Sequence, residues 1–373
     1  MNLIYLDHAA TTPVKEEVLK EMLPYFGVNY GNASSIYSIG RRSKKAIESA
    51  REKVAKTIGC REKEVYFTSC GSESDNLAIK GVAKANSEKG KHIITSKIEH
   101  PAVLNTCKCL EKDGFEVTYL NVDEKGFVDL EQLRNSIKDE TILISIMFAN
   151  NEIGTIQKVK EISDIAHNKN IIFHTDAVQA VGNVRIDVKE LGIDLLSMSA
   201  HKFYGPKGVG ALYIRRKPRV KIEAIINGGG QERGLRSGTL AVPLIVGLGK
   251  ASQLMQEDGE KDKQKIDKFA NQIINEFSKI KKVDLNGSLE HRWMGCLNFS
   301  FAGVEGESLM MAINDIAVSS GSACTSATLD PSYVIKAIGT KDELAHSSIR
   351  VGLGRFTTQE EVDYFIKRVK EEL

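Results

Sequence analysis

The sequence predicts an α/β fold in which helices cover both faces of a mostly parallel, seven-stranded sheet, with a smaller α+β domain added. Short apolar or β-branched runs alternate with stretches of helical periodicity, and such strand–helix–strand repetition is typical of parallel sheets. The chain of 373 residues is also longer than one ordinary hydrophobic core requires. After about Gly249 the alternation gives way to charged helical segments, which indicates a second unit.

The runs expected to form strands are short and rich in residues that suit burial on both faces of a sheet. They cover residues 64–68, 92–95, 116–120, 142–148, 171–175, 195–199 and 210–214. The helices expected in this half of the chain cover residues 41–58, 72–87, 101–113, 130–137 and 159–168. Asp129 fits the N-cap of the fourth helix, because its side chain can accept hydrogen bonds from the first turn.

The remaining third of the chain has a different pattern. A charged stretch at 256–282 has helical periodicity, and a strand at 295–301 and a helix near 307–314 follow it. A loop of small residues and a closing helix from about Thr358 end the chain. We therefore expect a large domain over 14–250 and a small domain formed by 1–13 and 251–373.

Composition and charge exclude several classes of function. Hydrophobic residues make up 42% of the chain and charged residues 27%, and the net charge of +2 gives no basic excess for nucleic acid or an anionic membrane. The longest apolar runs fall short of the ~20 residues that span a bilayer, and the N-terminus has no signal-peptide pattern. Six cysteines in a chain of this length do not form a disulfide framework, so we expect a cytoplasmic protein.

Polar side chains follow several of the expected strands. Open α/β sheets bind ligands at the carboxyl ends of their strands, so residues in these positions should share one site. The candidates are His100, Asn151, Asp176, Gln179, His201 and Lys202. Gly71 and Ser72 also lie between a strand and a helix, where backbone N–H groups can bind phosphate. An ordinary serine N-cap is the commoner explanation of that pattern taken alone.

Lys202 and Asp176 together indicate a cofactor. An arbitrary lysine is usually a solvated surface residue and an arbitrary aspartate a turn or capping residue. However, a lysine that forms a Schiff base and an acid that pairs with a pyridinium nitrogen are what pyridoxal phosphate requires. A carboxylate in contact raises the pKa of such a ring nitrogen by roughly 1–3 units, which keeps the ring protonated and electron-withdrawing.

Other site types have little support. The chain has no Walker-type phosphate loop, and the glycines at 205–210 lack Rossmann spacing. Cys107 and Cys109 have no second ligand pair, so we expect no metal site, and at least one of them should face the core. Cys60 and Cys296 are expected to be buried small residues. Cys324 lies among small polar residues, which favours an exposed thiol nucleophile about as much as an inert one.

At this point the sequence closely resembles the cysteine desulfurases of the NifS/IscS type. The resemblance runs from the first residues to about Phe356. Its motifs are YLDHAATTP (5–13), FTSCGSESDN (67–76), TSKIEHPAV (95–103), FANNEIG (148–154), HTDAVQ (174–179), SAHKFYGPKG (199–208), GGGQERGLRSGT (228–239), SSGSACTSA (319–327) and HSSIRVGLGRF (346–356). Membership implies the fold-type I pyridoxal-phosphate architecture and usually a homodimer with active sites at the subunit interface.

The resemblance also implies a role for each matching residue. Lys202 would hold the cofactor and shuttle the substrate α-proton, His100 would stack on the ring, Asp176 would pair with the ring nitrogen and Gln179 with the ring hydroxyl. Gly71, Ser72, Ser199 and His201 would bind the phosphate, with Thr239 reaching from the partner subunit. Asn151 and Arg350 would bind the substrate carboxylate, a role that suits a guanidinium independently, although a surface ion pair is the plainer explanation.

The implied reaction converts L-cysteine to L-alanine and leaves a persulfide on Cys324. A sulfur acceptor, such as an iron–sulfur scaffold or a thiolation enzyme, would then receive the sulfur. We expect the 319–327 segment to be mobile, since this thiol must meet both substrate and acceptor. The alternatives are a selenocysteine lyase or aminotransferase of the same fold, and a non-catalytic sulfur-transfer subunit.

Two positions depart from the family pattern. Relatives often have a small residue where this chain has Cys70, which we expect to be structural. The IscS branch carries a longer C-terminal tail for scaffold docking than a sequence ending at Leu373 provides, which favours a NifS-like or specialised relative.

Overall fold

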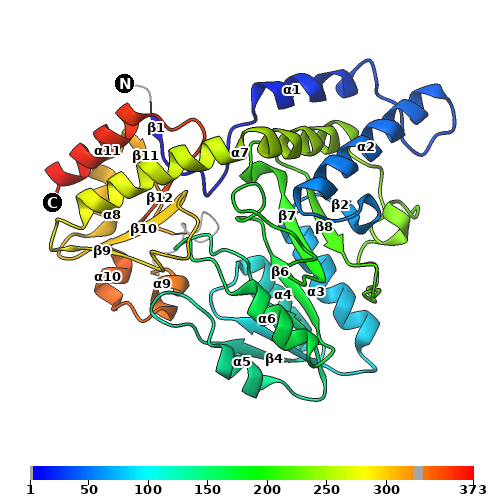
Figure 1. The fold of residues 1–373 in the computed structure, drawn as a ribbon, viewed down its shortest axis with the longest axis horizontal. Coiled ribbons are helices and arrows are strands. Elements are labelled where there is room, and N and C mark those ends of the chain that lie inside the picture. The colour runs from blue at the N-terminus through cyan, green and yellow to red at the C-terminus, as the bar shows by residue number, and fades with distance from the viewer. Residues whose placement is uncertain (1–2, 322–330) are drawn as a thin grey trace.

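The computed structural model describes residues 3–321 and 331–373 and confirms the predicted mostly parallel sheet (Figure 1). The main sheet has seven strands in the order β2-β8-β7-β6-β5-β3-β4. Only β8 runs opposite to the others, because it pairs antiparallel with both β2 and β7. The strands are β2 Val65–Thr68, β3 His92–Ser96, β4 Glu116–Leu120, β5 Thr141–Ser145, β6 Ile172–Asp176, β7 Leu195–Ser199 and β8 Gly210–Ile214.

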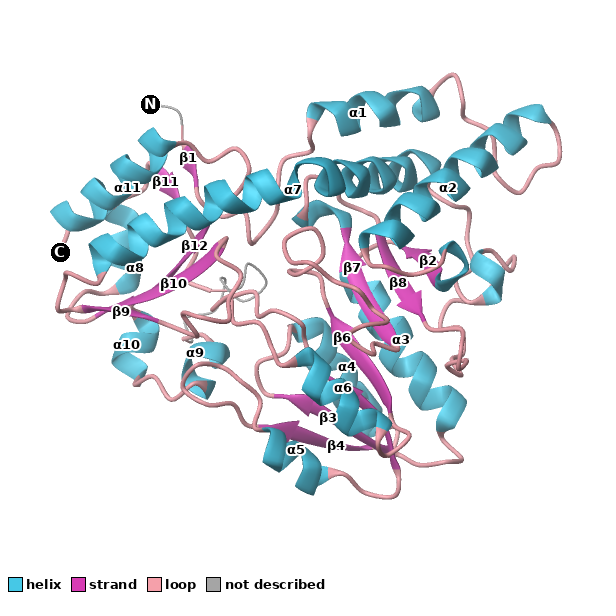
Figure 2. Cartoon of the chain, in the orientation of Figure 1, coloured by secondary structure: helices cyan, strands magenta, loops and turns pink. Residues whose placement is uncertain are grey.

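Helices cover both faces of this sheet, as expected (Figure 2). They are α1 Glu16–Met22, α2 Ser38–Thr57, α3 Gly71–Asn86, α4 Pro101–Lys112, α5 Leu130–Ser136, α6 Val159–His167 and α7 Val242–Phe277. Strand β2 shows how one sequence serves two faces. Val65 and Phe67 enter the core beneath α2, α6 and α7, whereas Tyr66 enters the core beneath α3 and α4. Both faces of β2 are covered, and all four of its residues are buried.

A smaller sheet lies beside the large one. Its three strands are antiparallel in the order β12-β10-β9, and a short parallel pair, β1 with β11, lies nearby. The elements are β1 Ile4–Tyr5, β9 Val283–Leu285, β10 Cys296–Phe301, α8 Gly306–Ala312, β11 Ile316–Ala317, α9 Tyr333–Ala337, α10 Asp342–His346, β12 Ser348–Gly352 and α11 Gln359–Glu371. The closing helix expected from about Thr358 is confirmed as α11, and Thr358 caps it with a capping box.

Helix α7 is longer than the sequence pattern predicted. It begins at Val242, not near residue 256, because the apolar run that starts it is buried and Pro243 fits its first turn. Its first part, to Met255, packs into the core of the large sheet, and its last part, from Ile266, packs into the core of the small sheet. The expected domain boundary at 250 falls inside this helix, and the division into two domains stays a prediction.

Two local details bear on the site. Asp129 caps α5 as predicted, since its Oδ1 accepts from the backbone N–H of Glu131 at 2.8 Å. Strand β5 ends at Ser145, three residues earlier than predicted, although Phe148 still donates to the carbonyl of Asp176 at 2.8 Å. None of the helices in the described part of the chain is long and apolar enough to cross a membrane.

Candidate active site

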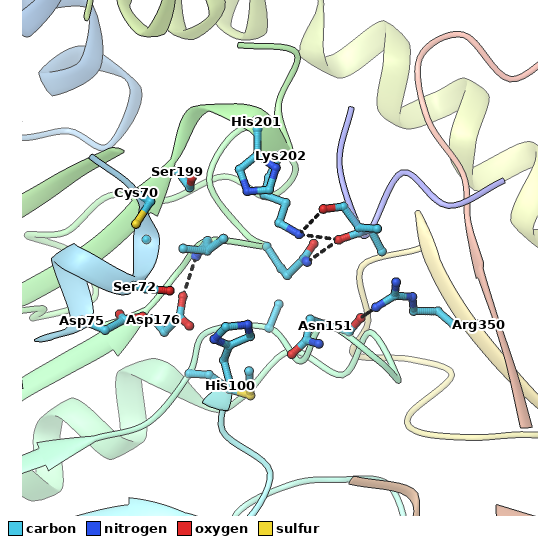
Figure 3. A pocket seen from close by; sticks show the side chains of 17 residues that line it. Cys70, Ser72, Asp75, His100, Asn151, Asp176, Ser199, His201, Lys202 and Arg350 are labelled. Atoms are coloured by element: carbon cyan, nitrogen blue, oxygen red, sulfur yellow. Dashed lines mark hydrogen bonds between the residues drawn. The ribbon is translucent and has the colours of Figure 1, made fainter. Parts of the chain in front are cut away.

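A cavity of about 190 Å³ lies at the carboxyl ends of the parallel strands (Figure 3). The structure brings most of the expected site residues to its wall. Those that line it are Gly71, Ser72, His100, Asn151, Asp176, Gln179, Ser199, His201, Lys202 and Arg350. Two expected residues are not among them. Thr239 is exposed on the surface, and Cys324 lies outside the described residues.

Lys202 reaches the cavity from the short 3-10 turn Ala200–Lys202 that follows β7. Its Nζ donates hydrogen bonds to the carbonyl oxygens of Ala9, at 2.6 Å, and Ala10, at 2.8 Å. The N-terminal segment therefore forms one wall of the site. Lys202 and Asp176 line the same cavity, which is the arrangement that a shared ring-shaped ligand needs.

Asp176 is the last residue of β6 and is 6% exposed. Its Oδ1 accepts from the backbone N–H of Val178 at 2.9 Å. Burial raises the pKa of this carboxyl group, while the nearby His100 and Lys202 oppose that shift. A buried carboxylate in this position gains from a cationic partner, and a protonated pyridine nitrogen is such a partner.

A second buried acid, Asp75, also lines the cavity. Burial and the neighbouring Asp176 raise the pKa of Asp75 well above its ordinary value, and its Oδ1 has no hydrogen-bond partner among the described residues. Its Oδ1 lies 3.7 Å from His174 Nε2, but burial lowers the pKa of His174 to about 3, so that ring is neutral. Each of these two carboxyl groups disfavours ionisation of the other, so the pair would gain from a further cation nearby.

The start of α3 is a candidate anion-binding turn. Cys70 is its N-cap and makes no side-chain hydrogen bond to the helix, whereas Ser72 lies inside the first turn, so the alternative of a serine N-cap is wrong. A Cβ at Gly71 would lie 2.6 Å from the Cγ2 of Val178, so a larger residue would fill the space. Backbone N–H groups and a hydroxyl at a helix start suit a phosphate.

The two histidines of the site are held in defined states. Nδ1 of His100, the N-cap of α4, accepts from the backbone N–H of Ala102 at 3.1 Å, which leaves the ring Nε2 to carry a proton. Nδ1 of His201 lies 3.1 Å from Thr11 Oγ1. Burial, followed by the charges of Lys202 and Lys207, lowers the pKa of His201 to about 4, so it is neutral near pH 7.

Arg350, on β12, is 1% exposed, so the alternative of a surface ion pair is wrong. It donates to the carbonyl of Asn151 at 2.9 Å and to Asp7 Oδ1 at 2.8 Å. Its Nε and the Oδ1 of Asn151 have no hydrogen-bond partner among the described residues. This guanidinium therefore keeps donor capacity for a carboxylate ligand. Asp7 lies in the YLDHAATTP motif (5–13), and its hydrogen bond with Arg350 does not follow from the sequence pattern.

The cysteines divide into inert and accessible ones. Cys107 is buried and Cys109 is exposed, as expected for two positions on one helix. Burial raises the pKa of Cys107 to about 12 and also raises that of the buried Cys296. Cys60 is only half-buried, which differs from the prediction, although burial raises its pKa to about 12. Cys70 lines the cavity, beside the anion-binding turn.

The fold and these side chains define a class of enzyme. A lysine amine, a buried carboxylate and an anion-binding helix start converge at the carboxyl edge of a mostly parallel sheet. That set of groups fits the aldehyde, the ring nitrogen and the phosphate of pyridoxal phosphate.

Comparisons with known proteins agree with this class. The model of the family described as aminotransferase class-V matches residues 4–365. Cysteine desulfurase IscS of Rickettsia prowazekii (strain Madrid E) is 54% identical over 368 residues, which cover 98% of this chain and 90% of that protein. The mitochondrial cysteine desulfurase of Saccharomyces cerevisiae (strain ATCC 204508 / S288c) is 52% identical over 369 residues, covering 99% and 74% respectively.

A solved structure titled NifS-like protein superimposes with a TM-score of 0.93 at 39% identity, covering 99% of both chains. The chain belongs to the class-V aminotransferase family and, within it, to the pyridoxal-phosphate-dependent cysteine desulfurases.

Proposed function

We propose that this chain converts L-cysteine to L-alanine and retains the substrate sulfur as a persulfide on Cys324. The observation that carries the proposal is that Lys202, Asp176 and Arg350, which come from three different segments, line one cavity. The identity of over half the residues with cysteine desulfurases along nearly the whole chain supports the same reaction.

The residues present fit pyridoxal phosphate. Its phosphate would be held at the start of α3, and its ring between His100 and the sheet, with the ring nitrogen against Asp176. The residues proposed for the phosphate are Gly71, Ser72, Ser199 and His201, and Gln179 is proposed for the ring hydroxyl. When bound, the cofactor withdraws electrons from the substrate and weakens the bonds at its α-carbon. A ring nitrogen that takes a proton would also give the buried Asp75 and Asp176 the missing positive charge.

The protein's own groups position the substrate and move its proton. Arg350 and Asn151 are proposed to bind the substrate carboxylate, since each has an unused polar atom beside the cavity. The Lys202 amine is proposed to accept the α-proton and return it to the product. Burial of Arg350 strengthens its attraction for a carboxylate, because water does not screen it.

The sulfur step balances without an external oxidant. The carbon–sulfur bond of L-cysteine breaks and a sulfur–sulfur bond to Cys324 forms, so that L-cysteine and an enzyme thiol give L-alanine and an enzyme persulfide. Attack by a thiol on that persulfide would pass the outer sulfur to an acceptor. The acceptor is proposed to be an iron–sulfur scaffold or a thiolation enzyme.

The assembly is proposed to be a homodimer in which Thr239 reaches the partner's cofactor phosphate. The exposure of Thr239 in the single chain is compatible with this role. We also propose a large cofactor-binding domain over 14–250 and a small domain carrying the Cys324 segment. A cytoplasmic location remains our proposal, on the basis of the bacterial relatives and the free cysteines.

Cysteine variants test the assigned nucleophile. The purified protein, loaded with pyridoxal phosphate, should form alanine from L-cysteine and, with a thiol reductant present, release the transferred sulfur as sulfide. Cys324→Ser should keep the visible absorbance of the bound cofactor and lose sulfide formation. Cys109→Ser is the matched control, because that thiol is exposed and lies away from the cavity. Normal sulfide release by Cys324→Ser would show that the nucleophile is another residue.

A lysine variant tests the cofactor anchor. Lys202→Ala should lose the absorbance of the covalently held cofactor and the conversion of L-cysteine. Retention of both would contradict the role of Lys202.

A further inference from the structure

The motif at residues 228–239 lines no part of the cavity of its own chain, yet specific backbone angles and side-chain contacts fix its conformation. Glu232 and Arg233 both adopt positive φ angles, of 46° and 58°, which residues other than glycine rarely do. Such a conformation persists only where surrounding contacts impose it. Two ion pairs connect this motif to the large sheet and its helices.

The first ion pair joins the motif to helix α2. Arg51 donates to both carboxylate oxygens of Glu232, at 2.7 Å and 2.8 Å, and both side chains are almost fully buried. Glu232 also accepts from the backbone N–H of Phe67 at 2.8 Å, on the outer side of β2. Strand β2 is an edge of the large sheet, so the motif closes that edge with side-chain hydrogen bonds.

The second ion pair joins the motif to the anion-binding turn itself. Arg236 donates to Glu73 through Nε, at 2.8 Å, and through Nη2, at 3.2 Å. Glu73 lies in the first turn of α3 and accepts from the backbone N–H of Ser69 at 2.9 Å. Burial alone would raise the pKa of Glu73, but the hydrogen bonds from Arg236 and Ser69 outweigh burial and lower it. Glu73 is therefore a carboxylate that Arg236 and the backbone N–H of Ser69 both hold by hydrogen bonds.

Residues 69–73 and 236 thus form one connected unit, and Thr239 lies only three positions beyond Arg236. We propose that the Glu73–Arg236 pair is a positioning device that links the phosphate-binding turn of one subunit to the phosphate contact which that subunit makes in the other. The two cofactor sites of the dimer would then share a single support. This inference rests on the proposed function and on the proposed dimer.

The geometry explains why this pair, and not an ordinary ion pair, can carry such a link. A guanidinium that meets a carboxylate through two parallel hydrogen bonds fixes orientation as well as distance. Lysine keeps the charge but cannot form the two-point contact. Arg236→Lys should therefore let the turn and the Thr239 segment relax, and cofactor release should become about tenfold faster, because charge-assisted hydrogen bonds of this kind contribute substantially to rigidity.

Mixed dimers separate the two ends of the link. One subunit carries Lys202→Ala and a distinct affinity tag, so that each dimer keeps a single site able to hold the cofactor covalently. Arg236→Lys is then placed either on the Lys202 subunit, beside that site's own turn, or on the other subunit, which supplies Thr239. Release of the cofactor is followed by its visible absorbance during a chase, and the ³¹P chemical shift reports its phosphate environment.

The proposal expects faster release and an altered ³¹P shift for both placements. An effect in only one placement, or in neither, would overturn the link. Glu73→Gln should match Arg236→Lys, and the double variant should release the cofactor no faster than the worse single variant, since both remove one interaction.

Arg215→Lys provides the matched control. Arg215 pairs with the buried Asp194, and its side chain is 25% exposed, against 19% for Arg236. It directly follows β8, at the end of that strand far from the cavity. It should leave cofactor release unchanged. If the unmodified protein binds no pyridoxal phosphate at all, the proposed function fails first. If the protein binds the cofactor and Arg236→Lys does not change the rate of its release, the proposed role of the Glu73–Arg236 pair is wrong but the proposed function stands.

Discussion

Two buried arginines in different parts of the molecule differ in how fully they are paired. Arg51, at the edge of the large sheet, is 3% exposed, and Arg350, at the wall of the cavity, is 1% exposed. Every guanidinium nitrogen of Arg51 has a partner in Glu48, Glu232 or the carbonyl of Val65. Arg350 leaves its Nε without a partner among the described residues.

This difference separates a structural charge from one held ready for a ligand. A buried guanidinium is stable only when its donors are satisfied, so the complete shell around Arg51 serves the fold. The ring of Phe67, 4.5 Å from its guanidinium carbon, completes that shell. Arg350 lines the cavity, where a substrate carboxylate could complete its shell.

The largest expected effect is a loss of stability when the fully paired Arg51 is removed. Arg51→Met should lower the free energy of unfolding of the holoenzyme by about 3–5 kcal/mol, because Glu232 would remain buried without a counter-charge. Urea unfolding followed by circular dichroism measures this. Arg51→Met combined with Glu232→Gln should recover part of the loss. A loss below 1 kcal/mol for the single variant would mean that the pair contributes little to the fold.

The matching change at the cavity should affect catalysis instead. Arg350→Lys should lower kcat/KM for L-cysteine about 100-fold, since truncating one partner of a buried charge pair costs roughly 2–5 kcal/mol. The absorbance of the bound cofactor should be retained, because Arg350 contacts Asp7 and Asn151 and not the anion-binding turn. Steady-state kinetics with L-cysteine and alanine detection would check it. Unchanged kinetics would remove Arg350 from the substrate site.

Glu99 extends the comparison to a buried acid that forms no ion pair with any residue the structure describes. Burial raises its pKa to about 8, from an ordinary 4.5. Between those values the folded protein keeps a proton that the unfolded chain releases. The free energy of unfolding should therefore fall as pH rises, by at most about 1.4 kcal/mol per pH unit, and level off above pH 8. Glu99→Gln mimics the neutral acid and should remove this contribution, measured by urea unfolding from pH 5 to pH 8.5. An identical slope in the variant would contradict the raised pKa.

The smallest effect is expected from removing an ion pair that is exposed to solvent, which serves as a baseline for the buried pairs. Lys263 and Asp267 pair at 2.5 Å on the outer side of α7, where both side chains contact solvent. Lys263→Ala should change neither the free energy of unfolding nor the kinetics measurably, because solvent screens such pairs. A clear loss of stability would show that the accessible surface of α7 is less solvated than its exposure indicates.

The sequence predicted those parts of the molecule that depend on local pattern. The strands at 116–120, 195–199 and 210–214 were predicted to the residue, because each is a short and largely apolar segment between turns or loops. The convergence of polar residues at strand ends follows from the rule for parallel sheets, and the cavity confirms that convergence. The start of α7 was missed, because an apolar run of eight residues is as compatible with a strand as with a buried helix.

The partners of the site residues could not be predicted in this way. Asp75 is one turn inside α3, and only the packing of that helix against the sheet directs it into the cavity. Asp7 and Arg350 are separated by 343 positions in the chain, and no local pattern predicts a hydrogen bond over that separation. The ion pairs of Glu73 and Glu232 with distant arginines belong to the same class of contact.

The length of α7 has a mechanical consequence. A helix of 36 residues is a rod roughly 54 Å long, and here each half of it is embedded in a different core. The sheet next to Lys202 and the sheet that carries Arg350 are therefore connected through one continuous helix, which opposes hinge motion between them.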